Sequence, residues 1–186
     1  MKNIDIGING FGRIGKCLFL QLIEDNYINI KAININNLSV EHFQDYISND
    51  SIHYTKKYKV EIIDDNFIIV NNKKIKIFNE KDPKKINWKD HKVEYLFETT
   101  GVFLTTEKAK LHDVDYLVMS APPKDFGTTP IYCYGVNEDK YNCEKIVSAA
   151  SCTTNCIAPM LKFLNKFDID NCNFITIHSA TSSQSV

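Results

Sequence analysis

Cys152 is the residue best suited to chemistry in this chain. It lies in the run A-S-C-T-T-N-C at positions 150–156, where a β pattern gives way to a helical one. A thiol at a helix amino terminus, or beside an imidazolium, ionises more readily than a free thiol, and the thiolate is the nucleophile. His178 stands at the end of the apolar run 174–177 and is a candidate partner. We therefore predict a nucleophilic cysteine assisted by a histidine.

The spacing of Cys152 and His178 is equally compatible with a buried thiol and a hydrogen-bonded core histidine. Cys156 lies one helical turn beyond Cys152, and we expect it to be a packed thiol that can form a disulfide with Cys152 under oxidation. No second pair of ligands follows these two cysteines at zinc-like spacing, so we predict no metal site.

A glycine turn near the amino terminus predicts a binding site for a dinucleotide. The run Gly10–Gly15 fits G-x-G-x-x-G, directly after an alternating strand pattern and directly before a helical one. The first glycine permits the sharp turn, the second lets the backbone approach a pyrophosphate, and the third lets the helix pack closely on the strand. The helix amino terminus then presents free N–H groups to the phosphates. A glycine turn without a ligand is the alternative.

The acidic residue that usually follows such a turn is missing. About 20 positions on, a carboxylate normally binds the ribose 2′-hydroxyl. Here Ile35 stands at the expected place, and the next carboxylate is that of Glu41. Asn34 or Asn36 offers an amide that both donates and accepts hydrogen bonds. Because no arginine nearby is placed to bind a 2′-phosphate, we predict NAD rather than NADP.

Periodicity predicts an α/β fold with a Rossmann-like, doubly wound and mostly parallel sheet. We expect strands at 4–8, 28–35, 95–98, 116–120, 131–134, 146–148 and 174–178, and helices directly after the glycine turn and at 38–48, 107–112 and 151–167. Short runs at 60–63, 67–70 and 74–78 are separated by Asp-rich and Asn-rich turns, which predicts an inserted antiparallel meander. Pro159 should bend the helix that contains it.

The composition is that of an ordinary globular protein. The chain has 186 residues, of which 44% are hydrophobic and 24% charged. Its 22 basic and 23 acidic residues give a net charge of -1, so no general field favours nucleic acid or an anionic membrane. The first residues enter a strand pattern at once, and no apolar stretch has the length of a signal sequence or a membrane span. We expect a cytoplasmic protein whose six cysteines are thiols.

Six motifs follow one another along the whole chain. They are I-N-G-F-G-R-I-G at 8–15, E-T-T-G-V-F at 98–103, S-A-P at 120–122, Y-G-V-N at 134–137, A-S-C-T-T-N-C at 150–156 and T-I-H-S-A-T at 176–181. In this order and spacing the chain resembles the amino-terminal half of the phosphorylating glyceraldehyde-3-phosphate dehydrogenases. The resemblance implies an NAD-dependent oxidoreductase of glycolysis that converts glyceraldehyde 3-phosphate and inorganic phosphate into 1,3-bisphosphoglycerate.

The resemblance also assigns functions to single residues. It implies that Cys152 forms the thioester and that His178 is its general base. Hydroxyl donors to phosphate groups are implied at Ser151, Thr153 and Thr181. The cofactor contacts that it implies are Asn9, Phe11, Gly12, Arg13, Ile14, Thr99, Gly101 and Ser120, with Lys81 beside the adenine. Gly10 and Gly15 of the glycine turn and the amide of Asn34 complete the predicted cofactor site. The chain departs from the family pattern at Ile35, Lys81, Ala149 and Ser185, where the family carries aspartate, arginine, asparagine and lysine.

By this resemblance, 1–151 is an NAD-binding Rossmann domain and 152–186 opens an incomplete, truncated α+β catalytic domain. We expect a homotetramer or another homo-oligomer at full length, and little catalysis by these 186 residues alone. The helix at 151–167 should expose apolar side chains. Erythrose-4-phosphate dehydrogenase, and a truncated non-catalytic NAD-binding module, are the alternatives to the leading function.

Overall fold

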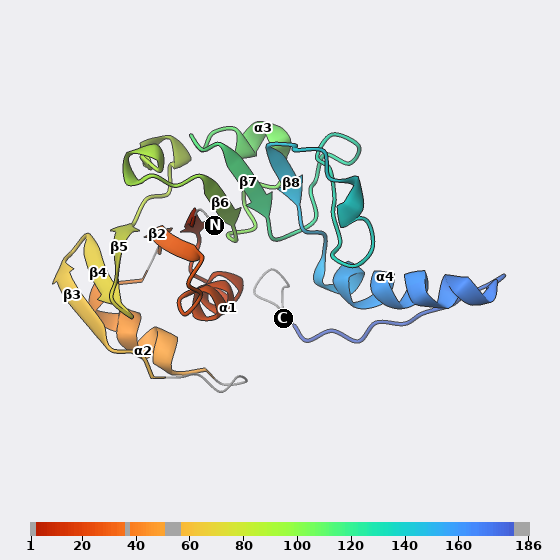
Figure 1. Ribbon diagram of the computed structural model, residues 1–186, viewed down its shortest axis with the longest axis horizontal. Coiled ribbons are helices and arrows are strands. Elements are labelled where there is room, and N and C mark those ends of the chain that lie inside the picture. Colours follow the sequence, from red (N-terminus) through yellow and green to blue (C-terminus); the bar gives the residue numbers. More distant parts are fainter. Residues whose placement is uncertain (1–2, 36–37, 51–56, 181–186) are drawn as a thin grey trace.

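The computed structural model describes residues 3–35, 38–50 and 57–180. Within them, eight strands form one sheet in the order β3-β4-β5-β2-β1-β6-β7-β8. The strands are β1 (Ile4–Asn9), β2 (Ile28–Asn34), β3 (Val60–Asp64), β4 (Phe67–Val70), β5 (Lys73–Phe78), β6 (Tyr95–Glu98), β7 (Tyr116–Met119) and β8 (Ile146–Ser148). All neighbours from β5 to β8 are parallel, and β3, β4 and β5 are antiparallel. The predicted parallel sheet is confirmed, and the predicted meander forms one edge of it (Figure 1).

The centre of the sheet is the point where the chain changes direction. After β1 the chain forms β2 on one side, and it later returns to form β6 on the other side of β1. In open parallel sheets, the crevice outside the carboxyl ends of the strands at such a switch point is where ligands bind. The glycine turn begins directly after β1 and therefore lies at this point.

The helices cover both faces of the sheet. The described helices are α1 (Arg13–Leu22), α2 (Phe43–Ser48), α3 (Thr106–Ala109) and α4 (Cys152–Leu164), with 3-10 turns at Val40–His42, Pro83–Lys85, Lys89–His91, Glu138–Lys140 and Asn165–Phe167. The helix predicted at 38–48 is thus a 3-10 turn followed by α2, and the one predicted at 107–112 ends at Ala109.

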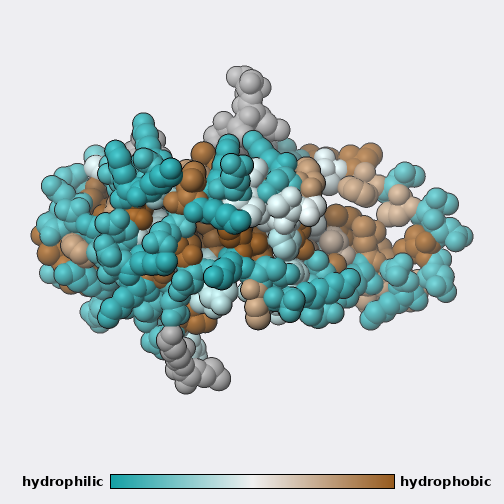
Figure 2. All heavy atoms as spheres, turned by 90° about the horizontal axis from the view of Figure 1, so that it is seen from above, coloured by the Kyte–Doolittle hydropathy of each residue, from teal (hydrophilic) through white to brown (hydrophobic). Residues whose placement is uncertain are grey.

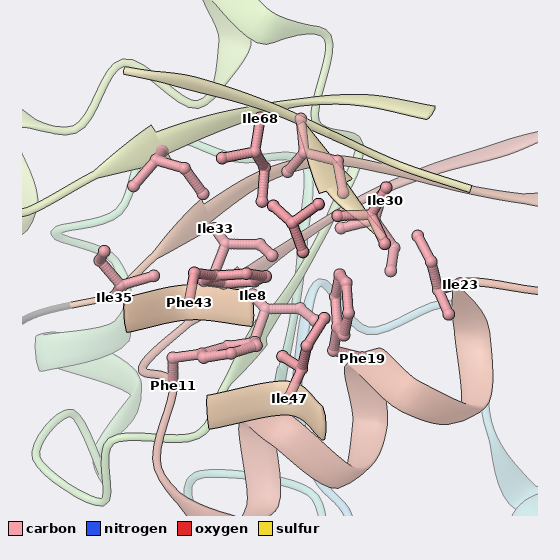
Figure 3. Packing of buried hydrophobic residues seen from close by; sticks show 14 of the residues in the cluster. Ile8, Phe11, Phe19, Ile23, Ile30, Ile33, Ile35, Phe43, Ile47 and Ile68 are labelled. Atoms are coloured by element: carbon pink, nitrogen blue, oxygen red, sulfur yellow. The ribbon is translucent and has the colours of Figure 1, made fainter. Parts of the chain in front are cut away.

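Two apolar clusters hold these layers together. On one face, Phe19 of α1 and Phe43 of α2 meet Ile8 and Ile33 from the central strands (Figure 3). On the other face, Trp88 and residues of β6, β7 and α3 form the second cluster. Fully burying a side chain of this size stabilises the fold by about 1.5–3 kcal/mol, so the sheet has a substantial core on both sides.

Two predicted strands are not formed. At 131–134 a single parallel bridge joins Ile131 to Ser148, after which the side chain of Asn137 accepts a hydrogen bond from the Cys133 N–H at 2.8 Å and turns the chain away from the sheet. Residues 174–178 are irregular and exposed; Ile175 and Ile177 are 92% and 98% accessible. Their β-branched pattern was misleading because a strand also needs a paired neighbour, and no strand of the described residues lies beside them.

Helix α4 continues through Pro159, and none of its side chains is buried. Met160, Phe163 and Leu164 are 49%, 58% and 40% exposed, which confirms the expected apolar surface of this helix. Hydrophobic side chains are visible at the end of the molecule from which α4 projects (Figures 1 and 2). Among the described helices, none combines the length and the apolar character needed to cross a membrane.

Candidate functional site

The three glycines of the turn meet three different requirements. Gly10 has a φ of +95°, and a Cβ there would lie 2.7 Å from Cγ2 of Thr100. A Cβ on Gly15 would lie 2.2 Å from the carbonyl oxygen of Gly10, so α1 packs on the turn only because this residue is glycine. A Cβ on Gly12 would meet nothing within 4 Å. The backbone at Gly12 is therefore open to an approaching group, as a pyrophosphate site requires.

The amino terminus of α1 is suited to bind an anion. Gly12 is its N-cap and makes no side-chain capping bond, and the first turn contains no acidic residue. The first N–H groups of such a helix have no partner within the helix and carry partial positive charge. The structure thus fits the phosphate groups of a dinucleotide at this place.

The other predicted cofactor residues lie at the carboxyl ends of β1, β6 and β7. The Thr99 hydroxyl donates to the carbonyl oxygens of Asn9 and Gly10 at 3.0 and 2.8 Å, which fixes the glycine turn to the end of β6. Gly101 follows with a φ of +73°, and the N–H of Ser120 donates to the Glu98 carbonyl at 3.0 Å.

Within the glycine turn itself, the three side chains face different surroundings. The ring of Phe11 is buried and stacks on Phe43, with 4.8 Å between centroids, so only its backbone is available to a cofactor. Arg13 and Ile14 are exposed on the first turn of α1. Contacts from these two side chains are therefore sterically possible, whereas a contact from the Phe11 ring is not.

A cavity of about 240 Å³ lies beside the turn. Residues from three strand ends contribute to its wall: Asn9 is the last residue of β1, Asn34 is the last residue of β2, and Glu80 and Lys81 follow β5. Thr100, Phe103 and His112 also line this cavity. The predicted residues Asn9, Asn34 and Lys81 are thus brought together, although they are far apart in the sequence.

The prediction that Asn34 binds ribose is not supported by its contacts. Both hydrogens of its Nδ2 are engaged, one by Oδ1 of Asn9 at 2.8 Å and one by the Glu80 carbonyl at 2.8 Å. Its Oδ1 accepts from the Glu80 N–H at 3.0 Å. The amide therefore has no donor left and acts as a clamp between loops. Ile35 is buried, and the other candidate, Asn36, lies outside the described residues.

A buried polar network behind the cavity was not predicted. Glu98 accepts from Nδ2 of Asn9 at 2.5 Å and from the Thr100 N–H at 2.7 Å. His112 places Nε2 at 3.5 Å from the Glu98 carboxylate, and its Nδ1 accepts from the Trp88 indole at 3.3 Å. All of these side chains except Thr100 are at most 3% exposed. The signal in the sequence was Glu98 itself, an acid at the end of an otherwise apolar strand.

The predicted nucleophile stands at the start of α4. Cys152 is its first residue, and Ser151 caps the helix because its hydroxyl accepts from the Thr154 N–H at 3.0 Å. Sγ of Cys152 lies 3.2 Å from Nε2 of His178. The structure therefore brings together the two residues that the sequence singled out, through an irregular segment rather than the predicted strand.

The partners of His178 fix its tautomer. Its Nδ1 lies 2.7 Å from the carbonyl oxygen of Ser179, and a carbonyl can only accept. In the neutral ring Nδ1 therefore carries the hydrogen, and the lone pair of Nε2 is directed at Sγ of Cys152. Both side chains are exposed. This is the orientation that a proton acceptor for the thiol requires.

Hydroxyl groups surround the cysteine. The Ser151 hydroxyl lies 3.0 Å from that of Thr153 and 2.7 Å from that of Thr154. The third predicted phosphate ligand, Thr181, lies outside the described residues. Cys156 is exposed, so the prediction that it is a packed thiol is wrong; the buried thiol of this region is Cys133, whose Sγ lies 3.6 Å from Oδ1 of Asn155.

Two family models match this chain, one toward each end. The family model described as the NAD binding domain of glyceraldehyde 3-phosphate dehydrogenase matches residues 4–106, and the model of the C-terminal domain matches residues 151–186. Glyceraldehyde-3-phosphate dehydrogenase of Sclerotinia sclerotiorum is 42% identical over 189 residues, which cover 99% of this chain and 55% of that protein.

Two further relatives give the same picture. Glyceraldehyde-3-phosphate dehydrogenase 1 of Kluyveromyces marxianus is 42% identical over 186 residues, covering 97% of this chain and 55% of the relative. Glyceraldehyde-3-phosphate dehydrogenase of Bacteroides fragilis is 40% identical over 187 residues, which cover 97% of this chain and 55% of that protein. The chain thus spans about half the length of the curated relatives that it matches.

Proposed function

The chain belongs to the glyceraldehyde-3-phosphate dehydrogenase family, and on that premise we propose that it supplies the NAD site and the nucleophile of an enzyme that oxidises and phosphorylates glyceraldehyde 3-phosphate to 1,3-bisphosphoglycerate. The observation that carries the proposal is the 3.2 Å contact between Sγ of Cys152 and Nε2 of His178. The relatives named above are all glyceraldehyde-3-phosphate dehydrogenases, so the erythrose-4-phosphate alternative has no support from them.

In the first step, Nε2 of His178 takes the proton of the Cys152 thiol. The thiolate attacks the aldehyde carbon, a C–S bond forms, and the π electrons of the carbonyl move to its oxygen. That oxygen takes the proton from His178, which gives a thiohemiacetal. His178 suits this step because its Nδ1–H is held by the Ser179 carbonyl, which keeps Nε2 directed at the sulfur. The helix amino terminus at Cys152 adds partial positive charge where the thiolate forms.

NAD, when bound at the glycine turn, would supply the two-electron oxidant for a hydride from the same carbon. Nε2 of His178 takes the hydroxyl proton in this oxidation. The thioester that is left on Cys152 is then cleaved by inorganic phosphate. A phosphate oxygen attacks the carbonyl carbon, the C–S bond breaks, and Cys152 leaves as thiolate with the acyl phosphate as product. We assign Ser151 and Thr153 as hydroxyl donors to the phosphate groups, because both flank the nucleophile on the first turn of α4. Thr181 is proposed for the same function from the family resemblance alone.

Family membership also leads us to propose a cytoplasmic, glycolytic enzyme that assembles as a homotetramer. The apolar side chains that α4 leaves exposed are compatible with packing against further protein.

The test combines cofactor titration with thiol labelling of the 186-residue chain. We expect saturable binding of NAD, followed by the fluorescence of Trp88 or by calorimetry. We also expect iodoacetamide to modify Cys152 faster than the other five cysteines, and His178→Ala to remove that advantage. In an enzyme containing this chain, Cys152→Ser should abolish turnover of glyceraldehyde 3-phosphate with NAD and phosphate. NAD binding with slow, uniform labelling would instead favour a non-catalytic NAD-binding module.

A further inference from the structure

The place where a ribose-binding carboxylate is expected lacks one. Folds of this kind usually bind the 2′-hydroxyl of the adenosine ribose with an acid at the end of the second strand, and the same charge repels a 2′-phosphate. Here that position holds Ile35, which is 2% exposed and belongs to the apolar cluster around Phe43. The side chain of Ile35 can neither accept a hydrogen bond from ribose nor repel a phosphate.

Asn34 does not take over the function of the missing acid, but its amide holds the backbone of another acidic residue, Glu80, in place. Its amide makes two hydrogen bonds with the backbone of Glu80, at 2.8 and 3.0 Å. Next to this clamp, β2 and β5 run parallel, with Asn34 opposite Phe78, and the Ile35 N–H donates to the Phe78 carbonyl at 2.9 Å. The backbone of Glu80 is thereby fixed directly beside the end of β2.

Glu80 also lines the 240 Å³ cavity, together with Asn9 and Thr100, which lie beside the glycine turn. A carboxylate there can accept hydrogen bonds from ribose hydroxyls, since it offers two oxygens and no hydrogen. We propose that Glu80 is the ribose-binding carboxylate of this chain and that it selects NAD against NADP. The proposal rests on the NAD site of the proposed function and identifies the residue that determines its cofactor specificity.

Lys81 is the competing charge in the same cavity wall. A cation beside the ribose would favour a 2′-phosphate, so the two neighbouring residues predict opposite specificities. Glu80 is half-buried and its backbone is clamped by Asn34, whereas Lys81 is exposed. An exposed ammonium on a flexible chain is screened by salt and loses entropy when it is fixed. We therefore assign the specificity to Glu80.

The experiment measures the dissociation constants of NAD and NADP by calorimetry for the whole chain and three variants. Glu80→Gln keeps the shape of the side chain and removes its charge. Glu61→Gln removes an equal charge from the exposed edge strand β3, outside the cavity, and is the matched control. Lys81→Gln tests the competing charge. Thermal unfolding of each variant shows that the fold is retained.

We expect the wild-type chain to bind NAD more tightly than NADP, and Glu80→Gln to reduce that preference about tenfold, the size of one charge-assisted hydrogen bond. Glu61→Gln should leave the preference unchanged, and Lys81→Gln should change it less than Glu80→Gln. An unchanged preference in Glu80→Gln, with NAD still bound, would overturn the assignment of Glu80 alone. Failure of the wild-type chain to bind either nucleotide would overturn the NAD site itself.

Discussion

The indole N–H of Trp88 donates to Nδ1 of His112 across 3.3 Å, in a region where both side chains are buried. An indole nitrogen is only a donor, so Nδ1 of His112 must be unprotonated. The hydrogen of the neutral ring then lies on Nε2, which is 3.5 Å from the carboxylate of Glu98. Trp88 thus fixes both the orientation and the tautomer of a histidine that lines the cavity beside the glycine turn.

His112→Leu should destabilise the protein and weaken NAD binding. The change removes the acceptor of the buried Trp88 indole N–H, and also a donor beside the carboxylate of Glu98, which holds Asn9 and the turn at Thr100. An unsatisfied buried group of this kind costs about 1–3 kcal/mol. We expect His112→Gln, which keeps an amide hydrogen near the same place, to recover part of both losses. Urea unfolding and NAD titration measure the two effects. If His112→Leu had the stability and the NAD affinity of the wild-type chain, the network would not contribute to holding the cavity wall in place.

Alanine substitutions at Gly12 and Gly15 should have different effects: the first should weaken NAD binding, and the second should destabilise the fold. In Gly15→Ala the new methyl group would lie 2.2 Å from the Gly10 carbonyl, so the helix must move and we expect a loss of several kcal/mol, similar to an overpacked core. In Gly12→Ala the methyl group meets no protein atom within 4 Å, and the φ of -77° suits alanine. The stability of this variant should equal that of the wild type. Its affinity for NAD should nevertheless fall at least tenfold, because the methyl group occupies the space of the pyrophosphate.

Thermal unfolding and calorimetry of these two glycine variants measure the contrast. Equal NAD affinity of Gly12→Ala and the wild-type chain would mean that the phosphates do not approach this part of the turn.

Local patterns predicted most of the fold. The strand, glycine turn and helix at the amino terminus follow from short-range periodicity, and so do the three strands of the meander. The failures at 131–134 and 174–178 have one cause: a β-branched run specifies a strand only where a neighbour offers backbone partners. Nothing within those short segments indicates whether such a neighbour exists.

The site was predicted in part for the same reason. Cys152 is recognisable because its surroundings are local, a cap and a helix start in consecutive residues. Glu80 beside the end of β2 depends on β5 lying next to β2, which is a matter of sheet order. The Trp88–His112 pair likewise depends on two loops that meet only in the folded chain. Contacts of this kind have no periodicity from which a single sequence reveals them.

Lys16 should be the lysine whose loss costs the most stability. Its Nζ lies 3.1 Å from Oδ2 of Asp50 and donates to the Asn49 carbonyl at 2.6 Å, and both charged side chains are almost completely buried. Lys16→Met would remove the Lys16 ammonium from beside the buried Asp50 carboxylate, and we expect a loss of about 3–5 kcal/mol. The matched control is Lys31→Met, whose pair with Asp5 is longer and more exposed and should contribute at most about 1 kcal/mol. Urea unfolding would contradict this view if the two variants were equally stable.

Ser151 should matter to the reactivity of Cys152 through the helix that both begin. Its hydroxyl accepts from the Thr154 N–H at 3.0 Å, so Ser151→Ala leaves that group without its cap and should cost about 1 kcal/mol. The first turn of α4 then frays, and the sulfur no longer stays within 3.2 Å of Nε2 of His178. We expect iodoacetamide to label Cys152 severalfold more slowly in Ser151→Ala. Ser151→Thr retains the capping hydroxyl and should label at nearly the wild-type rate, because the effect belongs to the cap; equal slowing in both variants would instead assign it to the volume of the side chain at position 151.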